Sequence, residues 1–161
     1  MQTSMTNGAN AMSPDLCRAR AWWLATLPLL GSQIGGWAPG LDAAIALTVV
    51  QTVVAVRRDR TPEALAVQVR LVYLVLLIVG SVPPMDVVHL VLFVGTCAQA
   101  AFGYCPLARM LSLLPWNRRV PFSVGLLLHT AFAPPAPEGV LAQQARWAEE
   151  EELNDPDLSV R

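Results

Sequence analysis

The longest uncharged stretch of the chain runs from Val87 to Ala108, 22 residues without one formally charged side chain. The hydrocarbon core of a bilayer is about 30 Å thick, and a helix crosses it with about 20 apolar residues. The stretch is therefore long enough to cross a membrane. Only 14% of the chain is charged and 54% is hydrophobic, whereas about 25% of a soluble domain is charged. The sequence therefore predicts a membrane protein.

Three shorter apolar segments precede this stretch, so the chain has four candidate crossings: about 21–38, 41–56, 64–82 and 87–108. A helix on the surface of a soluble bundle has one polar face, whereas the segments between 41 and 108 are apolar on every side. The predicted fold is all-α: a polytopic transmembrane bundle of about four helices over residues 21–109. The first segment is the weakest, because a proline and three glycines interrupt it. We expect it to span, with a re-entrant helix or a signal peptide as alternatives.

The arginines predict how these segments are oriented, because cytoplasmic loops of membrane proteins are enriched in positive charge. All eleven basic residues are arginines. Most of them lie before the first segment, between the second and third, or after the fourth: Arg18, Arg20, Arg57, Arg58, Arg60, Arg109, Arg118 and Arg119. The other two connections contain no arginine and carry Asp42 and Asp86. Four crossings therefore place every arginine cluster on the cytoplasmic side, with both termini inside, whereas three would place the first pair outside.

The regions outside the bundle have three different compositions. Residues 1–20 are expected to form a flexible N-terminal arm. Residues 110–137 combine apolar runs with Trp116 and Arg118, as in an amphipathic segment that lies in the cytoplasmic headgroup layer. Residues 138–161 are an acidic tail, which we expect to be solvated with one helix near Val140–Leu153. A docking peptide for a basic partner is the alternative. The net charge of −1 does not favour a nucleic-acid partner.

Four polar residues are predicted to lie in the inner half of the membrane: Gln51, Gln68, Arg70 and Gln99. An ionisable residue within a membrane is costly and is a functional hypothesis by default. Glutamines form hydrogen bonds between transmembrane helices. A cluster of these four would stabilise the bundle, or bind an anionic headgroup or a quinone carbonyl. The alternative is that Arg70 extends to the headgroups on its own.

Two histidines raise the question of a haem or pigment. His89 lies near the outer end of the fourth segment, and His129 follows that segment on the inner side. The two cannot ligate one iron within a single chain. His89 alone remains a candidate axial ligand of a haem or chlorophyll shared with another subunit, although such histidines more often form hydrogen bonds at interfaces. We predict no cofactor and no metal site.

The three cysteines, Cys17, Cys97 and Cys105, have no C-x-x-C spacing and do not indicate a disulfide framework or a zinc site. On one helix, Cys97 and Cys105 would be about 12 Å apart, too far for a disulfide. Arg109, one turn after Cys105, could lower the pKa of this thiol and make it reactive. The alternative is an inert cysteine beside Pro106.

The stretch Phe102–Asn117, FGYCPLARMLSLLPWN, resembles the end of the last crossing in small uncharacterised bacterial membrane proteins. Its G-x-C-P-L core is more distantly similar to the inner-membrane domain that some bacteria attach to rhodanese sulfurtransferases. In that family a tyrosine commonly follows the leucine and a glycine comes later, where this chain has Ala108 and Ser112. The resemblance implies a multi-pass protein of the bacterial inner membrane and carries over no activity.

No serine–histidine–acid set, glycine-rich phosphate loop or pair of carboxylates is present in the sequence. We therefore expect a non-enzymatic accessory or assembly subunit of a larger membrane complex, with a bioenergetic complex as the working guess. Its expected partners are the bilayer and other membrane subunits. Two alternatives come from other classes of protein. One is a thiol- or sulfur-handling protein that uses Cys105, and the other is a small transporter lined by Arg70 and the three glutamines.

Overall fold

The computed structural model describes residues 14–61, 63–118, 120–136 and 139–154. These residues form seven helices and no strand: α1 (Pro14–Ile34), α2 (Pro39–Asp59), α3 (Leu65–Gly80), α4 (Val87–Phe102), α5 (Pro106–Ser112), α6 (Val124–Phe132) and α7 (Val140–Asn154). The predicted all-α class is therefore confirmed. Residues 14–20, which we predicted as part of a flexible arm, belong to α1, which begins at Pro14 and continues past Pro28. Residues 1–13 lie outside the described part of the chain.

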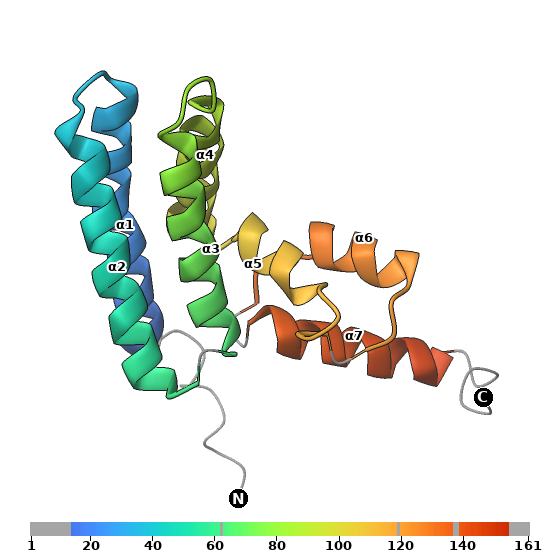
Figure 1. Cartoon of the computed structure of the whole chain (residues 1–161). Helices are drawn as coiled ribbons and strands as arrows, with labels where there is room; N and C mark the ends of the chain where they lie inside the picture. Colours follow the sequence, from blue (N-terminus) through green and yellow to red (C-terminus); the bar gives the residue numbers. More distant parts are fainter. Residues whose placement is uncertain (1–13, 62, 119, 137–138, 155–161) are drawn as a thin grey trace, which may run out of the picture.

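The first four helices form two antiparallel hairpins, α1–α2 and α3–α4 (Figure 1). The turns within both hairpins lie at one end, and the α2–α3 connection lies at the opposite end together with the start of α1. Helix α1 packs against α2 and α4, and α3 packs against the same two helices, so the four form one bundle. Helices α5, α6 and α7 pack on one another and extend to one side of the hairpins, roughly across their axes.

The fourth apolar segment does not form one straight helix. We predicted a crossing to Ala108, but α4 ends at Phe102 and α5 continues at an angle of 95°. Gly103 ends α4 with a φ of 73°, in the left-handed region that glycine adopts without strain. Pro106, which has no N–H to donate, is in the first turn of α5. The Sγ atom of Cys105 accepts a hydrogen bond from the Ala108 N–H at 3.4 Å and caps the new helix.

Fewer helices meet the criteria for a membrane span than the sequence predicts. By length and composition, α2 is long and apolar enough to cross a membrane, and α4 with α5 would be a second such span if the bent pair is counted as one. Helix α3 is apolar but has 16 residues. The described helices thus include one candidate span, or two, rather than the four predicted.

The bundle has an apolar core with buried polar side chains beside it, and its outer surface is apolar as well. Its apolar core includes Trp23, Leu30, Tyr73 and Leu77. Six polar side chains are buried beside this core: Thr26, Thr48, Gln51, Thr52, His89 and Thr96. The outward faces of α2, α3 and α4 consist largely of exposed valine, leucine and isoleucine: Val49, Val50, Val53, Val54, Leu71, Val75, Ile78, Val79, Leu90, Val91 and Val94.

Candidate functional site

Where the structure describes their hydrogen bonds, the four polar residues predicted to cluster bond to other partners instead of to one another. Gln51 in α2 donates from Nε2 to the Trp22 carbonyl at 3.2 Å and to Thr26 Oγ1 at 3.1 Å, both in α1. Arg70 donates to the carbonyl of Ala66 in its own helix at 2.7 Å. The predicted cluster is therefore wrong. Depth along a helix can be estimated from sequence, but the direction in which each side chain projects depends on how the helices pack.

Gln68 belongs to a different contact, which connects the start of α3 to the segment after α5. The side-chain amides of Gln68 and Asn117 form a reciprocal pair, with N···O distances of 2.9 Å and 2.6 Å. Trp116 Nε1 also donates to Gln68 Oε1, at 3.4 Å. The Trp-Asn pair that ends the G-Y-C…L-P-W-N stretch thus fixes this segment onto the bundle.

His89 fills the space between α3 and α4. It is 3% exposed, and its Nε2 lies 3.1 Å from the Leu77 carbonyl. A Cβ atom on Gly80 would lie 2.8 Å from the same nitrogen, so a glycine is needed where the ring approaches the helix. His129 is in α6 and stacks on Trp147 with ring centroids 5.3 Å apart. Because Nε2 of His89 already faces a carbonyl, an axial-ligand role would require His89 to give up this contact.

The environment of Cys105, between α4 and α5, favours the inert alternative over the reactive thiol. Burial raises the pKa of the Cys105 thiol, and this effect exceeds the opposing effects of the backbone hydrogen bonds and of Arg109. The Arg109 guanidinium lies over the Tyr104 ring, 4.4 Å from its centroid, and donates to the Thr130 carbonyl. The thiol is therefore protonated near neutral pH, because the effect of burial on its pKa outweighs that of the nearby arginines. No group of three or more metal-ligating side chains occurs in the part of the chain that the structure describes.

From the sequence, the arginines were used only to predict the orientation of the helices. The contacts that two of them make were not predicted. Arg20 in α1 donates from Nε to the Ala100 carbonyl at 2.6 Å and also bonds the Ala101 carbonyl, at the end of α4. Arg109 is only 3% exposed. Neither contact can be predicted from the sequence. Each joins residues of two different helices, and the way these helices pack is not visible in the sequence.

A second missed feature is a buried polar junction between α5, α6 and α7. Gln144 Nε2 donates to Ser112 Oγ at 2.9 Å and to Thr130 Oγ1 at 3.0 Å. All three residues are buried. One side chain of α7 thus connects both of the short helices that precede it. Helix α7 confirms the helix predicted near Val140–Leu153, but it packs on its neighbours through Gln144 instead of being solvated on every side. Residues 155–161 lie outside the described part.

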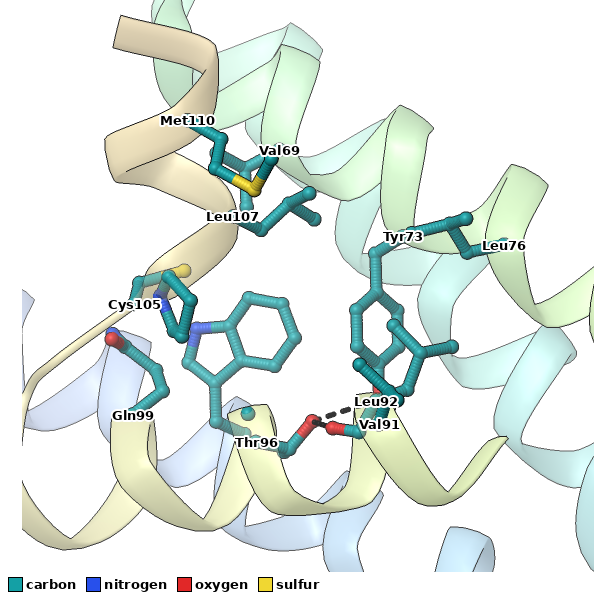
Figure 2. Close-up of a pocket in the computed structure, with 13 residues that line it drawn as sticks. Val69, Tyr73, Leu76, Val91, Leu92, Thr96, Gln99, Cys105, Leu107 and Met110 are labelled. Atoms are coloured by element: carbon teal, nitrogen blue, oxygen red, sulfur yellow. Dashed lines mark hydrogen bonds between the residues drawn. The ribbon is translucent and has the colours of Figure 1, made fainter. Parts of the chain in front are cut away.

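A cavity of about 190 Å³ lies between α1, α3, α4 and α5 (Figure 2). Its surface is almost entirely apolar, and its lining residues come from all four helices and the turn before α5: Trp23, Val69, Tyr73, Leu76, Val91, Leu92, Gly95, Thr96, Gln99, Cys105, Pro106, Leu107 and Met110. The Tyr73 hydroxyl is paired with Thr96 Oγ1 at 2.9 Å. Gln99 Oε1 is buried without a hydrogen-bond partner.

Comparison of the chain with protein-family models, curated proteins and solved structures finds no match. The resemblance of Phe102–Asn117 to bacterial membrane proteins therefore stays a prediction. What the protein does has to be argued from the bundle, its surface and the cavity.

The cavity is suited to binding rather than to proton transfer or nucleophilic chemistry. Its polar groups are neutral side chains, and the hydroxyl of Tyr73 is already engaged. The Cys105 thiol is buried and protonated, whereas the reactive form of a cysteine is the thiolate. The side-chain amide of Gln99 is the lining group with hydrogen-bonding capacity to spare.

Proposed function

We propose that this chain is a multi-pass integral membrane protein in which α1 to α4 cross the bacterial inner membrane. The supporting observation is the apolar outer surface of the bundle, combined with polar side chains buried between its helices. Threonine, glutamine and histidine are buried between the helices, while Val75, Ile78 and Val91 are 55%, 51% and 65% exposed. In water, large exposed patches of this kind mark a binding surface or an aggregation hazard. In lipid they are the ordinary outer surface, and polar residues connect the helices.

The helix lengths fit this proposal unequally. Helix α2 has 21 residues, about 32 Å at 1.5 Å per residue, which matches a hydrocarbon core of about 30 Å. Helices α3 and α4 have 16 residues each, about 24 Å long. Shorter helices are accommodated when the bilayer thins locally or flanking residues extend to the interface. The bend before α5 would then mark the level at which the chain leaves the hydrocarbon.

The charges support an orientation with both termini inside. Arg57, Arg58 and Arg60 lie at the end of the bundle opposite the two hairpin turns, and Arg109 and Arg118 lie in the α5–α6 region. Asp42 and Asp86 lie at the hairpin-turn end. Positive charge favours the cytoplasmic side. Helices α5 to α7 would then lie at the cytoplasmic surface, where α6 exposes an apolar face with Val124, Leu128 and Phe132.

Within this membrane setting, the role we propose is that of a non-enzymatic accessory or assembly subunit of a larger membrane complex. The polar side chains of the bundle core largely bond to one another or to nearby backbone, as Gln51, Thr48 and Tyr73 do. The surfaces left for contact are apolar helix faces in the membrane and the α5–α7 unit beside it. Such surfaces suit lateral packing against other membrane subunits.

Three experiments test the proposal. Alkaline carbonate extraction should leave the protein in the membrane pellet, and reporter fusions after residues 60 and 85 should be active in the cytoplasm and the periplasm, respectively. Release into the supernatant, or the opposite reporter pattern, would contradict the membrane assignment. Purification in mild detergent should recover a co-migrating membrane protein, whereas a lone monomer would contradict the accessory role.

A further inference from the structure

The cavity between α1, α3, α4 and α5 reaches the outer surface of the bundle. Val91 in α4 and Met110 in α5 both line it, yet they are 65% and 69% exposed. Trp23 lines the cavity as well and is 6% exposed, so the cavity extends from the surface inward to the core. In the orientation proposed above, Val91 faces lipid, and Met110 lies at the cytoplasmic surface just after the chain leaves the hydrocarbon. A ligand would therefore enter sideways from the bilayer.

The size and lining of the cavity favour an apolar ligand over water. An engineered apolar cavity of about 150 Å³ stays dry and binds benzene, and the cavity here measures about 190 Å³ with an almost entirely apolar lining. Water needs two to four polar partners to be held in such a space. The Tyr73 hydroxyl is already paired with Thr96, so the lining has too few free polar groups to hold water.

Gln99 gives the cavity one point of polar recognition. Its amide lies at the edge of the cavity, beside Cys105 (Figure 2), and its Oε1 is buried without a partner. A buried carbonyl that lacks a hydrogen bond destabilises the fold, and a ligand that donates to it removes this cost. A primary amide both donates and accepts hydrogen bonds, so it can pair with a hydroxyl or a carbonyl of a ligand.

We propose that this cavity binds a neutral membrane-soluble molecule, an apolar ring or chain that carries one hydroxyl or carbonyl group, with that group paired to the Gln99 amide. The inference rests on the proposed membrane location, because the ligand would come from the bilayer. No charged side chain lines the cavity, and the neighbouring thiol is protonated. A charged headgroup would be buried there without a counter-charge, so the ligand's polar group has to be neutral.

Cys105 provides a direct readout, because it lines the same cavity. In a Cys17→Ser, Cys97→Ser background, the rate at which N-ethylmaleimide modifies Cys105 is measured by mass spectrometry, in phosphatidylcholine nanodiscs at fixed pH. Three probes are added in turn: decylubiquinone, with ring carbonyls; 1-dodecanol, with a hydroxyl on a chain; and dodecane, with no polar group. Saturable slowing of the reaction reports occupancy of the cavity.

Two variants test the geometry in the same background. Gly95 lines the cavity, and a Cβ added there meets no atom within 4 Å. Gly95→Leu should therefore fill the space and abolish protection, with Gly95→Ala as the matched control that keeps it. Gln99→Leu should weaken protection by the polar probes roughly fivefold, as expected for the loss of one hydrogen bond. Circular dichroism melting confirms that each variant is folded.

Protection by decylubiquinone alone would identify a ring ligand, and protection by dodecanol alone would identify a chain; either supports the proposal. The proposal is overturned if neither polar probe protects, if dodecane protects at the same concentration as dodecanol, or if Gly95→Leu is protected like the parent. Resistance to carbonate extraction without any protection would overturn the cavity site and leave the membrane assignment intact. Release by carbonate would overturn the membrane assignment, together with the route of entry inferred from it.

Discussion

The guanidinium of Arg20 donates a hydrogen bond to the carbonyl of Ala100 at 2.6 Å, across 80 residues of sequence. The last carbonyls of a helix have no partner within that helix, and a cation near a helix C-terminus is favourable. Arg20 thus connects the start of the first hairpin to the end of α4, just before the chain bends toward α5.

Arg20→Ala should lower the free energy of unfolding by about 1–2 kcal/mol, because it removes charge-assisted hydrogen bonds to carbonyls that have no other cap. Thermal unfolding of the detergent-solubilised protein measures the change. The matched control is Arg57→Ala, which removes an exposed arginine at the end of α2 and should change stability by less than about 0.5 kcal/mol. Equal effects of the two substitutions would mean that the Arg20 contact contributes nothing of its own.

Glycine at position 80 is needed for the packing of α3 on α4. In Gly80→Ala, the new Cβ would lie 2.8 Å from Nε2 of His89, a rigid ring in a buried site, and the resulting repacking should cost about 1–3 kcal/mol. Gly95→Ala in α4 meets no neighbouring atom and should be neutral or stabilising by up to about 1 kcal/mol, because alanine favours helix more than glycine does. Denaturant or thermal unfolding compares the two. If removal of the ring in Gly80→Ala/His89→Ala recovers none of the loss, the clash is not its cause.

The sequence was sufficient to predict the helices but not their contacts. Apolar segments with turn residues between them predicted four helices near their observed positions, and the Pro39-Gly40 and Pro83-Pro84 pairs mark the hairpin turns. The bend after Phe102 was missed, because hydropathy does not register the backbone conformation of one glycine. The polar cluster was predicted wrongly for another reason. Gln51, Gln68 and Gln99 lie on helix faces directed at different neighbours. Similar depth along the helices does not bring side chains together.

The raised pKa of Cys105 predicts that its thiol is alkylated slowly and that the rate depends strongly on pH. Burial raises this pKa above the ordinary value of about 8.5, so the thiolate fraction near pH 7.5 is smaller than in an unfolded chain. Alkylation of the single-cysteine protein by a small maleimide should be at least about tenfold slower in the folded state than in dodecyl sulfate, and its rate should still rise above pH 9. Because the folded state disfavours the thiolate, stability should decrease as pH rises above the unfolded pKa. A rate that levels off below pH 8 would contradict the raised pKa.

Gln144 should determine whether α7 stays packed on α5 and α6. Its Nε2 donates to Ser112 Oγ and Thr130 Oγ1, and all three residues are buried. Gln144→Ala leaves both hydroxyls without this donor and should cost about 1–3 kcal/mol. The loss of stability should affect α7 and its neighbours more than the bundle, because α7 makes its main contacts with α5 and α6.

Hydrogen exchange should therefore quicken in α7 and α6 of this variant while α2 and α3 remain protected, since stability differs between regions of one structure. Gln143→Ala is the matched control: the neighbouring glutamine bonds the Pro134 carbonyl at an exposed position, and its loss should leave exchange in α7 within about twofold of the parent. Uniform loss of protection over α1 to α7 would show that the α5–α7 unit and the bundle unfold together, against the local role assigned to Gln144.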